Sequence, residues 1–489
     1  MKKNMYYSFI VTLIFFGRHF LTVGDPPNAF YYNQTLNDYY FILTLCLSFF
    51  LVMSAAFCLV ENFVKKSYGR FLFAVLGLSL LPLLDFVGLA ILGKNLPINP
   101  GIGRAIFPFL TLFYIPLIIF TAVRFKVEKF AERIVAILSI VSLVVIYYGV
   151  PRFFGVTHIE GEFAAGRRTP VYIMIFDATS YEVLNSPELR SYFPNFKKLA
   201  GESFVFTDAH SPGHNTINSI PKILTGINYG RLQRKDQRLL VLKSGSKNFN
   251  ELPTNDSIFH LARTHGYNTV LIGNVLPYCN LFGKDLTYGY VRPYTAKLQL
   301  VLPLAFTALL NVTSLAAREN VLNTFDKTFL MIAAAPLNTL FFLHFPVPHF
   351  PFVFDVHGYS HNYWDYIFKG GSYNYTERYV KQLRYADRKL GEIIDELKKK
   401  KLFDSALIIV AADHNHPTKY GGQRDMTKIP LFIKAPFQGK GYLVGGRSNL
   451  INLKPFLSEY FDSGAVEIKT LLDADGAKKC LTNCLKSIQ

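Results

Sequence analysis

Five long apolar stretches fill the first 150 residues of this 489-residue chain. They cover roughly residues 6–23, 39–60, 71–93, 105–123 and 134–150. A helix needs about 20 mainly apolar residues to cross the hydrocarbon core of a bilayer, and each stretch is near that length. The pattern therefore predicts an N-terminal bundle of five transmembrane helices over residues 1–150. The remainder of the chain must then fold in water and not in the hydrocarbon core of the bilayer.

The loops between these stretches alternate in charge. Lysine and arginine gather before the first stretch, between the second and third (Lys65, Lys66 and Arg70), and between the fourth and fifth. The loop at 24–38 contains neither residue type. By the positive-inside rule the basic loops are cytoplasmic, so we expect residues 151–489 to lie outside the cytoplasm. A signal peptide that is removed has a cleavage site of small residues. The first stretch lacks such a site, so we do not interpret it as a cleaved signal peptide.

The formal net charge of +18 points to an acidic partner. The excess is spread along the chain after residue 150, and its one dense run is the four lysines at 398–401. A basic run at a helix end is usually a solvated face, so we expect no nucleic acid and instead an anionic membrane surface or substrate. Five cysteines are too few for a disulfide scaffold, although Cys480 and Cys484 could pair in an oxidising compartment.

After residue 170 the pattern changes to short strands that alternate with amphipathic helices. Apolar runs rich in β-branched and aromatic residues occur at 171–176, 268–273, 341–345 and 406–412. Short buried strands separated by helices predict a mainly parallel sheet covered on both faces. Residues 377–401 carry an apolar stripe with helical spacing. We therefore expect a linker at 151–169 and an α/β domain over 170–489.

One uncharged segment, residues 298–317, is nearly long enough to span a bilayer. If it did, residues 177 and 413 would lie on opposite sides of the membrane. The chemistry described next requires those two residues on the same side. We therefore expect this segment to form a buried helix or one that lies against the membrane.

Polar side chains follow two of the predicted strands. Asp177 comes directly after the run at 171–176, and Asp413 and His414 come directly after the run at 406–412. An aspartate after a strand is otherwise a common helix cap. However, ligands gather at the carboxyl ends of strands in open α/β sheets, and oxygen together with imidazole suits zinc or manganese. These residues are therefore candidate metal ligands.

A loop with two hydroxyl side chains is the third feature. In residues 210–226, Thr216 and Ser219 could project from the start of a helix. The first turn of a helix offers free backbone N–H groups to an anion, so a hydroxyl placed there would meet a phosphate group. The loop is therefore a candidate position for a nucleophile.

These features together resemble the sulfatase-like branch of the alkaline phosphatase superfamily, over about residues 170–440. Sulfatases carry C/S-x-P-S-R-x-x-L-x-T-G, and residues 216–226 read Thr-Ile-Asn-Ser-Ile-Pro-Lys-Ile-Leu-Thr-Gly. The Cys or Ser that becomes formylglycine, and the Pro and Arg of the motif, are absent. The T-x-x-S-x-P spacing is instead similar to lipid A phosphoethanolamine transferases, which use an unmodified Thr after five membrane spans. Lipoteichoic acid synthases share that architecture.

Further matches come from three segments. Residues 260–273 are similar to the family's helix, GY-x-T turn and strand, and residues 428–436 to the strand after the metal site. His344 and His349 stand in a segment that resembles H-x(4)-H-x-P. Where the family reads D-H-G, this chain has Asn415 and His416 after His414, which leaves the role of His416 open.

The resemblance implies a role for each matched residue. Four residues would hold one divalent metal, with zinc favoured and manganese as the alternative: Asp177, Thr216, Asp413 and His414. Thr216 would also be the nucleophile, since it alone falls at the family's nucleophile position among the hydroxyls Thr179, Thr216, Ser219 and Thr225. His349 and His344 would be the other catalytic residues, stabilising the anion or protonating the leaving oxygen.

The implied activity is transfer of a phosphoethanolamine or phosphoglycerol headgroup through a phospho-threonine. The donor would be a phospholipid and the acceptor a glycan or lipid of the cell envelope. The resemblance places such an enzyme in the bacterial inner membrane, multi-pass, with its catalytic domain on the periplasmic side. Two alternatives stay open. A sulfatase-like or phosphodiesterase hydrolase would use water as the acceptor, and a degenerate domain would be inactive, although four intact ligand positions argue against the latter.

Overall fold

The computed structural model divides the chain into two compact units. The first unit comprises residues 1–155, 295–316 and 362–373, and the second comprises 156–294, 317–361 and 374–489. The structure describes residues 4–12, 36–63, 158–235, 238–242, 248–292, 312–359, 374–416, 425–473 and 485–487.

In the first unit the described residues are helical. Residues 4–12 form one helix, and α3 (Leu36–Phe63) covers the second apolar stretch. Among the residues that the structure describes, no helix has the length and hydropathy needed to cross a membrane. The third, fourth and fifth stretches lie outside the described residues, as do residues 298–311, Cys480 and Cys484. The five-helix membrane bundle therefore stays a prediction.

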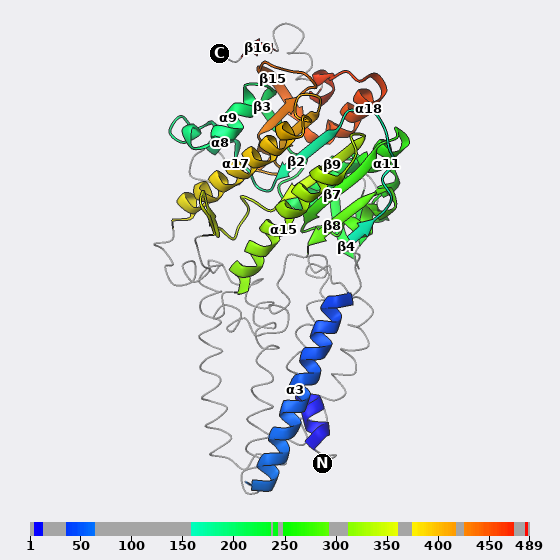
Figure 1. Cartoon of the computed structure of the whole chain (residues 1–489), viewed down its shortest axis with the longest axis vertical. Coiled ribbons are helices and arrows are strands. Elements are labelled where there is room, and N and C mark those ends of the chain that lie inside the picture. Colours follow the sequence, from blue (N-terminus) through cyan, green and yellow to red (C-terminus); the bar gives the residue numbers. More distant parts are fainter. Residues whose placement is uncertain are drawn as a thin grey trace. The chain divides into compact units, whose positions relative to one another are not determined.

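The second unit is built on one large sheet and two small ones (Figure 1). The large sheet contains β1 (His158–Glu160), β2 (Val171–Phe176), β3 (Phe204–His210), β7 (Asn268–Asn274), β8 (Tyr288–Arg292), β9 (Thr339–Phe345), β12 (Leu407–Ala411), β13 (Lys428–Ile429), β14 (Leu431–Lys434), β15 (Tyr442–Asn449) and β16 (Leu485–Ser487). The small sheets contain β4 (Arg231–Lys235), β5 (Arg238–Leu242) and β6 (Asn250–Glu251), and β10 (Phe354–Asp355) with β11 (Gly358–Tyr359).

The large sheet is mainly parallel, as predicted. Its strand order is β1-β8-β7-β9-β2-β12-β14-β3-β15-β16, with β13 paired to β3. The block from β8 to β12 is parallel throughout. β14 is antiparallel to both β12 and β3, and β15 is parallel to β3. Consequently β9, β2, β12, β3 and β15 all point the same way, and their carboxyl ends lie along one edge of the sheet.

The four strands predicted from apolar runs are confirmed as β2, β7, β9 and β12. Every residue of these strands is buried, which is expected where helices cover a sheet on both faces. Aromatic side chains of neighbouring strands pack together on the sheet. Tyr172 of β2 stacks on Phe341 of β9 with 4.6 Å between ring centroids.

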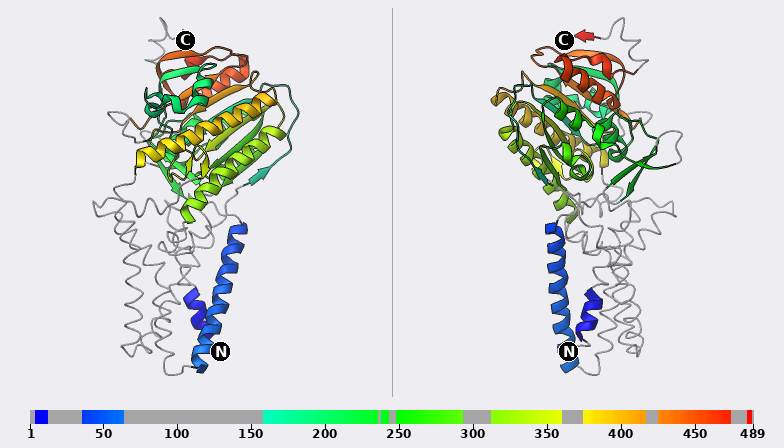
Figure 2. Two further views of the ribbon diagram at one scale, coloured as in Figure 1. Left: turned by 60° about the vertical axis from the view of Figure 1, so that its left-hand side comes forward. Right: turned by 90° about the vertical axis from the view of Figure 1, so that its right-hand side faces the viewer.

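Helices cover both faces of the sheet. Figures 1 and 2 show α15 and α17 across one face, with α11 and α18 on the other. The helices are α8 (Tyr181–Asn185), α9 (Pro194–Ala200), α10 (Thr216–Thr225), α11 (Ile258–Thr264), α12 (Tyr278–Phe282), α15 (Val312–Ala334), α17 (Tyr375–Lys399) and α18 (Leu453–Ser463). Short 3-10 helices are η3 (Arg190–Tyr192), η4 (Thr254–Asp256), η5 (Gly283–Asp285), η7 (Leu450–Asn452) and η8 (Ile468–Leu471). α17 confirms the helix predicted over 377–401, and its apolar stripe is buried.

A buried carboxylate joins α17 to α9. The residue before α9, Phe193, gives it no side-chain cap. Asp387 of α17 accepts hydrogen bonds there instead, from Asn195 N at 3.0 Å, Phe196 N at 2.8 Å and Asn195 Nδ2 at 3.0 Å. Burial raises the pKa of Asp387 to about 6, despite these hydrogen bonds, so the carboxyl is ionised at pH 8. It therefore acts as the cap of α9 from another helix.

Replacement of this carboxylate should destabilise the domain. We expect Asp387→Ala to lower the free energy of unfolding at pH 8 by about 2 kcal/mol, because it leaves buried N–H groups of α9 without an acceptor. Denaturant unfolding followed by circular dichroism measures the change. Asp395→Ala is the matched control, since Asp395 lies on the same helix and is exposed. Equal losses in the two variants would contradict the capping role.

Candidate metal and nucleophile site

Three acidic or imidazole side chains meet where adjacent strands end. Asp177 follows β2, Asp413 follows β12, and His344 is the penultimate residue of β9, in register with Ile175 of β2. Since β2 lies between β9 and β12, the three side chains converge on one point. His344 Nε2 lies 3.8 Å from Asp177 Oδ2, and His414 Nε2 lies 3.3 Å from Asp177 Oδ1.

Two ligand atoms at this point are buried without a partner. Asp413 Oδ1 accepts from the backbone N–H groups of Ala178 and His414, at 3.1 and 3.0 Å. Its Oδ2 has no hydrogen-bond partner among the described residues, and neither has His344 Nε2. Leaving buried polar atoms unpaired costs free energy unless something else contacts them. Both atoms face the Asp177 carboxylate, so a bound cation fits them.

Hydrogen bonds orient both imidazoles. His414 Nδ1 donates to the carbonyl of Asn415 at 2.8 Å, which leaves Nε2 to face Asp177. His344 Nδ1 lies 2.8 Å from the hydroxyl of Tyr278, a residue of α12 that sequence reasoning missed. When Nδ1 donates to the Tyr278 oxygen, Nε2 presents a lone pair to the site. Such contacts fix the tautomer and orientation of metal-binding histidines.

The electrostatics of the cluster also favour a cation. Burial opposes ionisation of Asp177, but His349, His414 and His344 outweigh it and hold the pKa of its carboxyl well below the usual range. Burial likewise opposes protonation of His414, but Asp413 and Asp177 raise the pKa of its imidazole to about 10. The ionised carboxylate of Asp177 therefore contributes negative charge at the point where the ligand atoms meet.

Two overlapping sets of residues have ligand atoms within 4.8 Å of one another. One set is Asp177, His344 and Asp413, and the other is Asp177, His349 and His414. Carboxylate oxygen together with imidazole nitrogen suits zinc or manganese. Asp177, Asp413 and His414 thus lie together as the sequence predicted. His344, which the sequence suggested only as a catalytic residue, also presents a ligand atom.

Thr216 is the first residue of α10, and its hydroxyl faces the cluster. Asn215 caps the helix by accepting from Asn218 N at 3.0 Å. Thr216 Oγ1 lies 3.5 Å from Asp177 Oδ1 and is buried. The three competing hydroxyls each donate to a backbone carbonyl: Ser219 to Gly213 at 3.1 Å, Thr179 to Phe176 at 3.0 Å and Thr225 to Pro221 at 2.7 Å. Of the four hydroxyls, Thr216 is the one directed at the metal-ligand cluster.

His349 lies on the more exposed side of the cluster. It is half-buried, in a segment with cis peptide bonds at Val347-Pro348 and Phe350-Pro351. Its Nδ1 donates to the carbonyl of Phe350 at 2.6 Å, and its ring meets that of His414 edge to face. Among the described residues, nothing forms a hydrogen bond with His349 Nε2, so this atom is available to a substrate that enters from solvent.

His416 forms part of an aromatic wall beside the cluster. Its ring stacks on Tyr379 with 4.1 Å between centroids and on Tyr375 with 5.5 Å, and meets Phe352 edge to face. Burial lowers the pKa of His416 to about 3, helped by the positive charge of neighbouring histidines. The imidazole is therefore neutral. Where this chain departs from the family's D-H-G, the His416 ring stacks on aromatic side chains.

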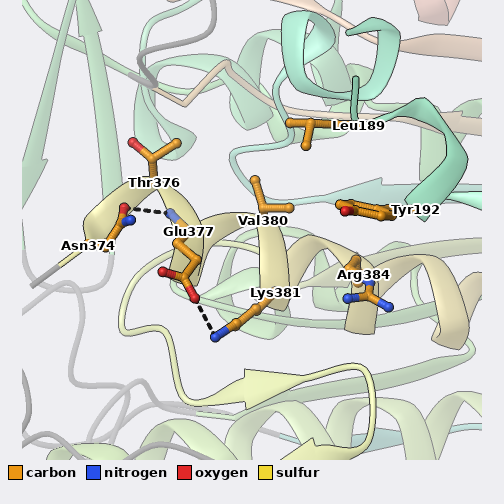
Figure 3. A pocket seen from close by; sticks show the side chains of 8 residues that line it. All are labelled: Leu189, Tyr192, Asn374, Thr376, Glu377, Val380, Lys381 and Arg384. Atoms are coloured by element: carbon orange, nitrogen blue, oxygen red, sulfur yellow. Dashed lines mark hydrogen bonds and ion pairs between the residues drawn. The ribbon is translucent and has the colours of Figure 1, made fainter. Parts of the chain in front are cut away.

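A separate cavity of about 580 Å³ lies between η3 and the start of α17 (Figure 3). The guanidinium of Arg384 lies over the Tyr192 ring at 4.9 Å, and Lys381 pairs with Glu377 at 2.6 Å. None of the residues at the strand ends lines this cavity. Cavity size alone therefore does not locate the chemistry.

The model of the sulfatase family matches residues 170–463. No curated protein matches the chain. Similar solved structures include the phosphonate monoester hydrolase of Agrobacterium radiobacter (16% identical over 60% of this chain and 74% of that chain, TM-score 0.39). A protein of the alkaline phosphatase superfamily from Vibrio parahaemolyticus is 16% identical over 64% of this chain and 68% of that chain, with a TM-score of 0.38. The integral membrane protein lipooligosaccharide phosphoethanolamine transferase A of Neisseria meningitidis is 12% identical over 98% of this chain and 98% of that chain, with a TM-score of 0.40.

Proposed function

The chain belongs to the sulfatase family, and on that premise we propose that it transfers a phospho-headgroup from a phospholipid to a glycan or lipid of the bacterial cell envelope. The observation that carries the proposal is the Thr216 hydroxyl at the start of α10, 3.5 Å from the Asp177 carboxylate. The headgroup is phosphoethanolamine or phosphoglycerol. Phosphate diesters of this kind have a phosphorus atom that a hydroxyl can attack and an alkoxide that can leave.

Two features favour transfer over sulfate ester hydrolysis. A threonine stands where sulfatases carry the Cys or Ser that becomes formylglycine, so the reacting group is an ordinary hydroxyl. The five apolar stretches would hold the domain at a membrane, next to phospholipid. In this proposal the catalytic domain lies on the periplasmic side of the inner membrane, where envelope acceptors are present.

Asp177, His344, Asp413 and His414 would hold one divalent metal, zinc or manganese, and Thr216 would complete its ligands. When bound, the metal lowers the pKa of a hydroxyl and neutralises charge on phosphoryl oxygens. The protein's own contribution is positioning. Asp177 orients the Thr216 hydroxyl, and the backbone N–H groups at the start of α10 face a phosphate group.

Transfer proceeds in two displacements. In the first, Thr216 Oγ loses its proton to solvent and bonds to phosphorus, while the bond from phosphorus to the diacylglycerol oxygen breaks. His349 Nε2 donates the proton that this oxygen takes. In the second, an acceptor hydroxyl bonds to phosphorus and passes its proton to His349. The bond to Thr216 then breaks, and its oxygen regains a proton from solvent.

The intact mass of the full chain tests this function. Incubation in detergent with phosphatidylethanolamine or phosphatidylglycerol should add the mass of one headgroup phosphate, located on Thr216 by peptide mapping. An envelope glycan extract should then remove the added mass and gain the headgroup. If Thr216 stays unmodified while sulfate or phosphate esters are hydrolysed, the chain is a hydrolase instead.

Loss of the Tyr278 hydroxyl should weaken metal binding. We expect Tyr278→Phe to lower the affinity for zinc about tenfold, because His344 loses the group that orients it. Competition with a chelator measures the affinity. Tyr288→Phe is the matched control, since the buried Tyr288 hydroxyl has no hydrogen-bond partner among the described residues. An equal effect of both substitutions would assign the loss to packing.

A further inference from the structure

A second cavity is lined in part by the loop that precedes Thr216. It has a volume of about 410 Å³ and is lined by residues 210–214 of this loop, by α10 and by the carboxyl end of β15. β3 and β15 pair in parallel up to their last residues, His210 and Asn449. The cavity therefore opens at the same edge of the sheet as the candidate metal site.

The distance between the two sites follows from the strand order. β3 lies two strands from β12, and neighbouring strands are about 4.8 Å apart, so the strands that lead to His210 and to Asp413 are about 10 Å apart. The loop at 210–215 runs directly from the cavity to Thr216. A substrate held at Thr216 can therefore extend into this cavity.

The cavity is lined by basic side chains and amides. The basic side chains are Lys222, Arg447, His210 and His214, and the amides are Asn218, Asn228 and Asn449. No aspartate or glutamate is among the described residues that line it. Cations bind an anion, and amides can donate to and accept from hydroxyl groups. The lining thus suits a ligand that carries both a negative charge and several hydroxyls.

Lys222 is a partly buried cation without a carboxylate partner. Its Nζ donates to the carbonyl of Pro212 at 3.1 Å and lies 5.1 Å from the centre of the Tyr229 ring. Burial lowers the pKa of Lys222. No carboxylate of the described residues forms an ion pair with it, although a buried charge is costly unless it is paired. The cavity therefore contains a positive charge that an anionic ligand would neutralise.

Carboxylates contact several of the residues that line the cavity. His210 Nε2 lies 2.9 Å from Asp208, and Thr427 donates to Asp425 at 2.6 Å. Arg447 pairs with Asp473 through Nε at 3.5 Å, and its side chain is 57% exposed. Through its remaining N–H groups the guanidinium can contact a second anion, because it presents five donors in a fixed fork.

We propose that this cavity binds a phosphate-bearing sugar of the acceptor, with Lys222 and Arg447 on the phosphate and the asparagines on the hydroxyls. The identity of the ligand as acceptor rests on the proposed function, whereas binding of a sugar phosphate does not. A volume of about 410 Å³ is within the range of small-molecule sites. The cavity would hold the acceptor beside the phospho-threonine and so determine which glycan is modified.

Calorimetry on the full chain in detergent tests binding directly. The protein carries Thr216→Ala and is kept in chelator, so that a metal-bound phosphate does not contribute. The probes are glucose 6-phosphate, glucose and glycerol 1-phosphate. We expect glucose 6-phosphate to bind most tightly, and Lys222→Met with Arg447→Gln to weaken it at least about tenfold. Undetectable binding of glucose 6-phosphate, or tighter binding of glycerol 1-phosphate, overturns the proposal.

A charge-matched control separates the cavity from the net charge. Lys197→Met with Lys440→Met removes the same charge from two exposed positions and should leave the affinity unchanged. If Lys222→Met with Arg447→Gln does not fold, Arg447→Gln alone is used, because the Arg447 side chain is exposed and its replacement should not affect folding. Equal affinities in the cavity variants and wild type, or equal losses in the control, overturn the proposal.

The role of the cavity in transfer is measured separately. With Thr216 present and loaded with a headgroup, glucose 6-phosphate should remove the adduct faster than glucose does, and the cavity variants should slow this step about tenfold. If no adduct forms on the wild-type chain, the proposed function fails, and the calorimetry still decides whether the cavity binds the sugar phosphate. Equal rates with glucose and glucose 6-phosphate contradict the acceptor assignment.

Discussion

Thr216→Ala should abolish headgroup transfer while leaving the protein folded. We expect kcat to fall at least about 10³-fold, because the variant lacks the oxygen that attacks phosphorus. The substitution removes one hydroxyl and one methyl at the start of a helix, and the capping bond from Asn218 N to Asn215 does not involve it. Turnover of phosphatidylethanolamine and the thermal unfolding profile together measure the two effects.

Two further variants make this assignment specific. Thr216→Ser keeps a hydroxyl in the same position and should retain part of the activity. Ser219→Ala removes the bond to the Gly213 carbonyl that holds the loop, so it should lower activity less than Thr216→Ala does. If Ser219→Ala were inactive and Thr216→Ala retained near-normal turnover, the mechanism would have to be rebuilt around Ser219.

The central strands could be predicted because their local sequence reflects their final environment. β2 and β12 are buried on both faces, and such strands consist almost entirely of apolar residues. β15 gave no comparable signal. Its register with β3 shifts between Val444 and Arg447, next to Gly446, which has a φ of 93°. A strand with a bulge and exposed positions lacks the periodicity from which it could have been identified.

The site was predictable where function depends on position at the end of a strand. Asp177 and Asp413 follow apolar runs, and the strand ends bring them together as expected. His344 as a candidate metal ligand was missed, because its placement depends on β9 being the neighbour of β2. The strand order is a long-range property that spacing along the chain does not reveal.

The side chains that surround the site could not be predicted from any local sequence pattern. Tyr278 reaches His344 across 66 positions of sequence, and a lone tyrosine carries no motif. His416 could be placed only once α17 was known to bring Tyr375 and Tyr379 against its ring. Contacts of this kind depend on helix packing against the sheet, so they became visible only with the three-dimensional structure.

Asp413→Asn should remove the metal from the purified chain. The side chain has two distinct oxygens: Oδ1 accepts from two backbone N–H groups, and Oδ2 is buried and directed at the cluster. Asparagine can keep the first contact through its carbonyl oxygen. It then places an NH₂ group where Oδ2 stood, and a hydrogen-bond donor cannot coordinate a cation. The variant should therefore fold, but with a site that lacks both a ligand and a negative charge.

Elemental analysis after dialysis measures this loss. We expect about one zinc or manganese ion per wild-type chain and less than about one tenth of that in Asp413→Asn, with kcat lowered at least about 10³-fold. Asp285→Asn is the matched control, because Asp285 is also buried, pairs with His260 and has an Oδ2 without a partner among the described residues. Asp285 is not at the carboxyl end of a strand, so Asp285→Asn should keep the metal. Full occupancy in Asp413→Asn would remove Asp413 from the site, whereas loss in both variants would indicate a general effect of buried aspartates on folding.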